Sequence, residues 1–271
     1  MKKSVQFISF LFCMLIFTVA CSNNENADSS SNKNEQLSNT TKYVELTISA
    51  AASLKNAMEV IQRTYQEEHP DTTLTFNFGS SGALQQQISQ GAPVDLFFSA
   101  AEEKFDYLVE EGLINEEDGI DLLGNSLVLV IPKNESSINS FEDLTKSEID
   151  SISIGTYETV PAGKYAKEAL EKMGIWEEIE SKIVFAKDVR QVLSYVETGN
   201  VDAGLVYKTD ALNSDKVEIV ASADPAIHGP IIYPIGIIKN TKHYEEAKKF
   251  YEYLQSDHAL KVFEEYGFTI K

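Results

Sequence analysis

The sequence predicts an α/β protein built as two lobes. Segments with the two-residue period of strands alternate along the chain with segments of helical spacing, and this alternation is typical of sheets covered by helices. A first series ends around Gly124, and a long apolar strand over 126–131 opens a second series. The two changeovers predict two crossing segments between the lobes. The expected lobes are 43–124 together with 234–271, and 125–233.

The first lobe is expected to hold both ends of the folded body. Its predicted strands cover 44–49, 73–78, 95–99 and 231–238, and its predicted helices cover 54–65, 83–89, 244–254 and 259–266. Pro234 cannot donate a ladder hydrogen bond, so it predicts an edge strand or a bend. The second lobe is expected to hold strands over 126–131, 152–154, 183–185, 203–206 and 217–220, with helices over 163–173 and 190–197.

The first 20 residues have the features of an export signal. Two lysines precede an apolar run from Val5 to Ala20, which is short for a membrane span. The residues before Cys21 resemble a bacterial lipobox, in which this Cys becomes the acylated first residue, although Thr18 stands where Leu is usual. We expect a lipid anchor at Cys21, on the extracytoplasmic side of the cell membrane. An ordinary secretory signal, cut near Ala20, is the alternative.

Residues 21–42 are expected to form a flexible tether. They are almost entirely small, polar or charged, and such a stretch cannot bury enough apolar surface to offset its ordering entropy. The only cysteines are Cys13, inside the signal, and Cys21. The remaining body therefore has no disulfide, Cys-ligated metal or Cys nucleophile, and hydrophobic cores must stabilise it.

The chain is strongly acidic, with a formal net charge of −19. A surface of this sign makes nucleic acid an unsuitable partner. It also repels anions at long range, so any anion site must act through local dipoles and hydrogen bonds.

Two serine-bearing turns each follow a predicted strand and open a predicted helix. One holds Ser53, and the other is Gly79-Ser80-Ser81-Gly82. Taken alone, each serine is expected to cap its helix. A helix start also offers unpaired N–H groups to an anion, and ligands of open α/β sheets bind beyond the carboxyl ends of strands. Two such turns together therefore indicate a ligand site.

Three further segments could present hydrogen-bond donors. Ala162 follows Pro161 at the start of a predicted helix, where its N–H is uncrowded. Val189 begins another helix, which we expect Asp188 to cap. Tyr207 ends a strand with a phenol that can donate one hydrogen bond, although a core or rim tyrosine is the usual explanation.

Taken together, these segments resemble the periplasmic molybdate-binding proteins. The matching segments stand in family order from about residue 44 to the end of the chain. They are AAASL at 50–54, the serine turn at 79–82, APVDLFFSA at 92–100, LLGNSLVLV at 122–130, VPAGKYAKEAL at 160–170, DVR at 188–190, GLVY at 204–207 and the terminal YGFTIK.

The resemblance implies a two-lobed type II periplasmic-binding-protein fold with the anion in the cleft. Carried over by position, the hydroxyl and N–H groups of two serines, two further N–H groups and one phenol would bind it. These residues are Ser53, Ser81, Ala162, Val189 and Tyr207. Ser80 could replace Ser81 if the turn is shifted. The chain departs from the family at Gly82, where relatives often carry another Ser.

The resemblance also implies a ligand and a partner. The implied site has no carboxylate acceptor, which suits a fully ionised anion such as molybdate or tungstate. Another oxyanion, such as sulfate, or a small organic anion is the alternative. The protein would deliver the anion to the permease of an ABC importer, with lobe closure around the ligand. We expect a monomer without a cofactor and without a metal other than the oxyanion.

Other classes of protein fit the sequence less well. A serine esterase would need G-x-S-x-G, which is absent, and the four histidines lie outside any recognisable catalytic segment. The acidic run over 116–121 lacks EF-hand spacing, so we expect a solvated loop there. The effector domain of a transcription regulator can share the fold class, but here an export signal stands in place of a DNA-binding module.

Overall fold

The computed structural model describes residues 43–135 and 137–271. These residues form an α/β body with two β-sheets, as predicted. The predicted signal over 1–20, Cys21 and the tether over 21–42 lie outside the described residues. Within the described ranges, no helix is both long and apolar enough to cross a membrane.

The first sheet has six strands in the order β11-β4-β10-β3-β1-β2. They are β1 (Val44–Ala51), β2 (Thr72–Gly79), β3 (Leu96–Phe98), β4 (Ile114–Gly124), β10 (Ile232–Ile238) and β11 (Thr269–Ile270). β1 runs parallel to β2 and β3, with Ala51 opposite Gly79 and Ala50 opposite Phe98. The carboxyl ends of these three strands therefore meet at one edge of the sheet.

The second sheet has five strands in the order β7-β6-β8-β5-β9. They are β5 (Leu127–Pro132), β6 (Ile152–Gly155), β7 (Ile183–Ala186), β8 (Ala203–Tyr207) and β9 (Val217–Ser222). β6 runs parallel to β7 and β8, whereas β5 is antiparallel to β8 and β9. The end of β8 therefore lies beside the start of β5, with Tyr207 opposite Leu127.

Two segments connect the sheets, as predicted. The chain leaves the first sheet at Gly124, enters the second at Leu127, leaves it at Ser222 and returns at Ile232. The two segments contact each other, because Asn125 N donates to Ile231 O at 3.2 Å. The assignment of whole lobes to 43–124 with 234–271, and to 125–233, stays a prediction.

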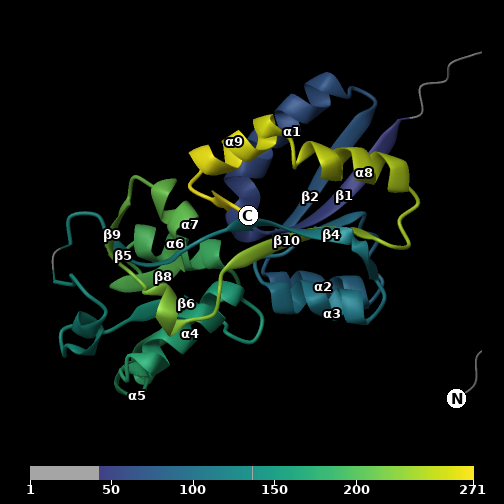
Figure 1. Cartoon of the computed structure of the whole chain (residues 1–271). Coiled ribbons are helices and arrows are strands. Elements are labelled where there is room, and N and C mark those ends of the chain that lie inside the picture. Colours follow the sequence, from purple (N-terminus) through teal and green to yellow (C-terminus); the bar gives the residue numbers. More distant parts are fainter. Residues whose placement is uncertain (1–42, 136) are drawn as a thin grey trace, which may run out of the picture. The chain divides into compact units, whose positions relative to one another are not determined.

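Helices cover both faces of the first sheet (Figure 1). One face carries α1 (Lys55–Glu68), α8 (Tyr244–Tyr253) and α9 (Asp257–Glu265), and the other carries α2 (Ser81–Ser89) and α3 (Glu102–Glu110). The cores on the two faces are separate clusters. On the first face, the Tyr65 and Phe250 rings meet edge to face at 4.8 Å. On the second, Phe97 stacks on Phe105 at 6.4 Å.

Helices α4 (Pro161–Lys172), α6 (Val189–Glu197) and α7 (Lys208–Leu212) pack against strands of the second sheet, and α5 (Trp176–Ile179) packs against α4. Glycine lets one of them approach the sheet closely. A Cβ at Gly163, in the first turn of α4, would lie 2.0 Å from Gly155 O at the end of β6. The start of α4 is therefore held against the carboxyl end of a strand, which is where the predicted site lies.

The structure differs from the sequence-based expectation at an acidic segment of the first lobe. The acidic run over 116–121, expected as a solvated loop, belongs to strand β4. Its acidic residues are mostly exposed, but Asp118 is buried and accepts hydrogen bonds from Asn115 Nδ2 and Tyr244 Oη. This polar segment is a strand because it pairs with β10. The sequence lacks the alternating apolar residues that would predict a strand here.

The position of β10 was only half predicted. It lies between β3 and β4, so Pro234 is not in an edge strand. The expected bend is present as a register shift between Tyr233 and Pro234 in the pairing with β4. The irregularity accommodates the missing N–H of proline.

Candidate functional site

The five residues predicted to bind a ligand line one small cavity. Residues from both sheets and their helices form its walls. β1, β2 and the turns that follow them form one side, and α4, α6 and β8 form the other. The cavity has a volume of about 10 Å³, the space of about one water molecule. Its lining residues are Ala51, Ala52, Ser53, Gly79, Ser81, Ala100, Val160, Pro161, Ala162, Val189 and Tyr207.

Ser53 lies in the short 3₁₀ turn η1 (Ala52–Leu54), which links β1 to α1. Its hydroxyl does not cap the helix, because neither η1 nor α1 has a side-chain capping bond. Instead, Ser53 Oγ lies 2.9 Å from Tyr233 Oη in the buried interior. The expectation of a capping serine is therefore wrong here, and the hydroxyl is held at the cavity wall.

Ser81 is the first residue of α2 and is fully buried. Its Oγ accepts a hydrogen bond from the backbone N of Ala100 at 2.8 Å. A backbone N–H can only donate, so the Ser81 hydroxyl proton remains available for another acceptor. Ser80 precedes the helix, makes no side-chain capping bond and does not line the cavity. The structure thus brings Ser81, rather than Ser80, to the cavity.

Ala162 and Val189 contribute the first turns of two helices. Pro161 begins α4 and has no N–H, so Ala162 has the first free amide of that helix. Val189 begins α6, where Asp188 accepts from Gln191 N at 2.9 Å. The predicted cap at Asp188 is confirmed. Since this cap serves the third amide of α6, the Val189 amide remains free of an intrahelical acceptor.

Tyr207 ends β8 with its side chain buried. Its hydroxyl donates to Ala100 O across a long 3.4 Å separation. Burial raises the pKa of Tyr207 well above its usual value, and the neighbouring Tyr233 adds to this effect. The phenol therefore stays protonated and can act as a donor at any physiological pH.

The cavity wall carries no charged side chain among the residues that the structure describes. Arg190, next to Val189, has its guanidinium Nη1 4.0 Å from Asp210 Oδ1. Burial raises the pKa of Asp210 to about 7, although the Arg190 charge lowers it in part. Arg190 is thus paired with a buried carboxyl group, and the wall itself offers hydroxyl groups and backbone N–H groups.

Contacts across the cleft hold the two sides of the cavity together. Gly82 N donates to Thr159 O at 2.9 Å. A Cβ at Gly82 would lie 2.6 Å from that oxygen, so this approach needs glycine. Nearer the surface, Lys164 of α4 forms an ion pair with Glu103 of α3. The structure therefore shows the two sides in close contact.

Sequence reasoning missed three residues at this site. Ala100 contacts both Ser81 and Tyr207 through its backbone, and a backbone role leaves no side-chain signal. Tyr233 and Asn125 form hydrogen bonds behind Ser53. Both lie in or next to segments that connect the sheets, so their position could have drawn attention, but their partners are far away in sequence.

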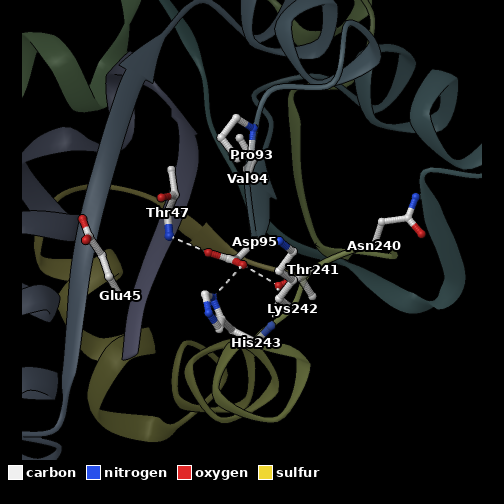
Figure 2. A pocket seen from close by; sticks show the side chains of 9 residues that line it. All are labelled: Glu45, Thr47, Pro93, Val94, Asp95, Asn240, Thr241, Lys242 and His243. Carbon is white, nitrogen blue, oxygen red and sulfur yellow. Dashed lines mark hydrogen bonds and ion pairs between the residues drawn. The ribbon is translucent and has the colours of Figure 1, made fainter. Parts of the chain in front are cut away.

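A second pocket lies at the opposite end of β1 and has a volume of about 410 Å³. Figure 2 shows Asp95 at its centre, with the backbone N of Thr47 and the side chains of Thr241 and His243 directed toward the carboxylate. Asp95 accepts from Thr47 N at 2.7 Å and from the Thr241 hydroxyl, and lies 3.4 Å from His243 Nδ1. These contacts attach the loop after β10 to the sheet. None of the predicted site residues lines this pocket.

Comparison with known proteins identifies the family of the chain. The family described as bacterial extracellular solute-binding protein matches residues 46–269. The chain belongs to this family. YvgL of Bacillus subtilis (strain 168), provisionally named an ABC transporter substrate-binding lipoprotein, is 56% identical over 269 residues, which are 99% of this chain and 98% of YvgL. The molybdate-binding protein ModA of Haemophilus influenzae is 38% identical over 232 residues, which are 83% of this chain and 90% of ModA.

The extracellular solute-binding protein fold is also shown by a solved structure. The periplasmic molybdate-binding protein of Azotobacter vinelandii superposes with a TM-score of 0.77 at 22% identity, covering 83% of this chain and 99% of that one. The predicted two-lobed fold is confirmed. The family consists of solute-binding proteins and not of enzymes, which confirms that expectation for this chain. It also places the protein outside the cytoplasm.

Proposed function

We propose that this solute-binding protein captures a tetrahedral oxyanion, molybdate or tungstate, in the cavity at Ser53 and Ser81. The protein would then deliver the anion to the permease of an ABC importer. The observation that carries the proposal is the donor character of the wall. Ser81 Oγ already accepts from Ala100 N, so its proton points elsewhere, and the Tyr207 phenol stays protonated. Relatives named molybdate-binding proteins support the choice of anion.

The available donors are sufficient for tight binding without a cation. They are the hydroxyl and N–H groups of Ser53 and Ser81, the N–H groups of Ala162 and Val189, and the Tyr207 phenol once its long hydrogen bond to Ala100 O is exchanged for one to the anion. Charge-assisted hydrogen bonds contribute roughly 1.5–3 kcal/mol each after competition with water. A few such bonds exceed the cost of association and permit sub-micromolar affinity. Screening over about 8 Å at physiological salt limits repulsion from the acidic surface.

An anion larger than water needs more space than the cavity provides. The contact between Gly82 and Thr159 and the Glu103–Lys164 ion pair would therefore have to separate for entry. Both contacts would then reform as longer contacts around the ligand, because the bound anion keeps the two sides slightly further apart. Closure of this kind follows from two sheets joined by two short segments.

Calorimetry of the protein with molybdate, tungstate, sulfate and phosphate tests the proposal. Ligand at about a thousand times its Kd should add about 4 kcal/mol to the free energy of unfolding, which a thermal melt also detects. Molybdate and tungstate should bind most tightly. If sulfate, phosphate or a small organic anion stabilises the protein and molybdate does not, the proposed ligand is wrong.

We further propose that Cys21 is lipidated and that the residues before Tyr43 tether a monomeric body to the outer side of the cell membrane. The apolar run before Cys21 supports this, as does the name of YvgL. Cys21→Ser should move the protein from the membrane fraction to the soluble extracytoplasmic fraction of expressing cells. A wild-type protein found only in the soluble fraction would contradict the anchor.

A further inference from the structure

A chain of hydrogen bonds runs from the segment between the two sheets to Ser53. We propose that Asn125 and Tyr233 are positioning residues for oxyanion binding, because this relay makes the Ser53 hydroxyl a proton donor toward the cavity. The relay would favour anions that carry no proton over those that do. This inference rests on the proposed function of the Ser53 cavity.

The orientation of the Asn125 amide is set by its own backbone. Ser126 N donates to Asn125 Oδ1 at 2.8 Å, so the amide oxygen faces that N–H. The amide nitrogen then points the other way, where Nδ2 lies 2.9 Å from Thr209 Oγ1 and 3.0 Å from Tyr233 Oη. An amide nitrogen has two hydrogens and no acceptor. Both hydrogens have a partner, and Tyr233 Oη must accept one of them.

The Tyr233 phenol faces two hydroxyl groups, those of Ser53 and Tyr207, and in the described chain the one with hydrogen-bond geometry is Ser53, at 2.9 Å. Tyr233 is fully buried, and burial raises its pKa well above the usual value, so the phenol keeps its proton. In the described chain, its oxygen has hydrogen bonds with Asn125 and with Ser53, the latter at 2.9 Å. Because Asn125 only donates and buried donors are almost always satisfied, the Tyr233 proton points to Ser53 Oγ.

Ser53 then has its own proton left to donate. Its hydroxyl accepts from Tyr233, and a hydroxyl that accepts at one lone pair can still donate its proton elsewhere. Ser53 lines the cavity, so this proton points toward a bound anion. Ser81 reaches the same state by accepting from Ala100 N. The Ala100 amide can only donate, so it fixes the donor role of Ser81 toward the cavity. The donor role of Ser53 depends instead on the side chains of Tyr233 and Asn125.

The relay lies where the two halves of the molecule meet. Thr209, which shares the Asn125 amide, belongs to α7 beside the second sheet, whereas Tyr233 belongs to β10 of the first sheet. Asn125 N also donates to Ile231 O of the returning segment at 3.2 Å. Asn125 is thus held by groups on both sides of the connection, which explains why its orientation is well defined.

The experiment compares molybdate, which has no proton, with monohydrogen phosphate at mildly alkaline pH. Tyr233→Phe removes the donor to Ser53 and should lower the ratio of molybdate to phosphate affinity about tenfold. Asn125→Asp keeps the size and the acceptor for Ser126 N, but makes Tyr233 donate away from Ser53. Ser53 would then face the cavity with a lone pair, and the ratio should fall roughly 10- to 100-fold.

Thr209→Val is the matched control, because it removes a hydrogen bond from the same Asn125 amide and leaves the relay in place. Its affinity ratio should stay within about twofold of the wild-type ratio. The charge added in Asn125→Asp repels both dianions alike and therefore cancels from the ratio. Phosphate binding that appears in Asn125→Asp and is undetectable in the wild type counts as the expected shift. Thermal melts establish that each variant is folded.

Two results would overturn the relay. One is an unchanged ratio in folded Tyr233→Phe and Asn125→Asp, and the other is an equal loss of the ratio in Thr209→Val. Both leave the proposed function intact, provided that the wild-type protein binds molybdate. A wild-type protein that binds none of the oxyanions contradicts the proposed function itself.

Discussion

Replacing Ser81 with alanine should weaken anion binding and also destabilise the ligand-free protein. The two effects have separate causes. The hydroxyl proton of Ser81 would be lost to the anion, and the hydroxyl oxygen would be lost to Ala100 N, which donates to it at 2.8 Å. Ser81 is fully buried, so water cannot readily replace either partner.

The magnitudes follow from these two losses. A hydrogen bond to a charged group contributes about 1.5–3 kcal/mol, so the Kd for molybdate should rise roughly 10- to 150-fold. Leaving the buried Ala100 N–H without an acceptor costs about 1–3 kcal/mol of stability. For a body of this size, each kcal/mol lowers Tm by about 2–4 °C.

Calorimetry and thermal melting of Ser81→Ala and Ser80→Ala measure both effects. Ser80 is the matched control, because it is buried in the same turn, makes no side-chain capping bond and does not line the cavity. Ser80→Ala should leave the Kd within about twofold, and it should cost less stability than Ser81→Ala, because it leaves no buried N–H without an acceptor. A Ser81→Ala protein with wild-type affinity, or a larger loss of affinity in Ser80→Ala, would refute the assignment.

Three further changes test the surroundings of the cavity. Gly82→Ala places a Cβ 2.6 Å from Thr159 O, so closure should cost about 1–3 kcal/mol. Calorimetry should then show a Kd about 5- to 150-fold higher, and unchanged affinity would mean that this contact is absent from the bound state. Glu103→Gln breaks the exposed ion pair with Lys164, so it should raise the Kd at most about fivefold. This increase in Kd should vanish in high salt, and an increase that persists in high salt would have another cause. Burial raises the pKa of Asp210 to about 7. Between about pH 4 and pH 7 the folded protein therefore keeps a proton on this carboxyl group that the unfolded chain has lost. The free energy of unfolding falls as pH rises through this range. Asp210→Asn should therefore gain stability relative to wild type over that range, by up to about 4 kcal/mol, in urea unfolding at each pH; parallel pH profiles of the two proteins would contradict the raised pKa.

The predicted elements with strong local signals agree with the structure. Strand β1 and helix α1 follow the alternation over 44–49 and the helical spacing over 54–65. The cap at Asp188 was also expected, because a carboxylate before a helix accepts from its first amides. Strand β4 was missed, since its acidic residues carry no apolar period and only pairing with β10 orders them.

Helix capping shows where local reasoning fails at the site. A serine before a helix is expected to cap it, yet Ser53 bonds to Tyr233 and Ser81 accepts from Ala100. Both partners are distant in sequence, 180 and 19 residues away. Local propensity describes what a side chain can do within its own turn, and it cannot register a competing partner supplied by another strand.

The sequence by itself determined the α/β class, the changeovers between two series of elements and the turns that carry Ser53, Ser81, Ala162, Val189 and Tyr207. These features are local, because they depend on periodicity, small residues and helix starts. Only the tertiary structure decided that the five residues line one cavity and that Ser81 rather than Ser80 reaches it. It also decided that Asn125 and Tyr233 stand behind Ser53. Hydrogen-bond direction depends on which donor faces which acceptor, and the folded chain alone brings those groups together.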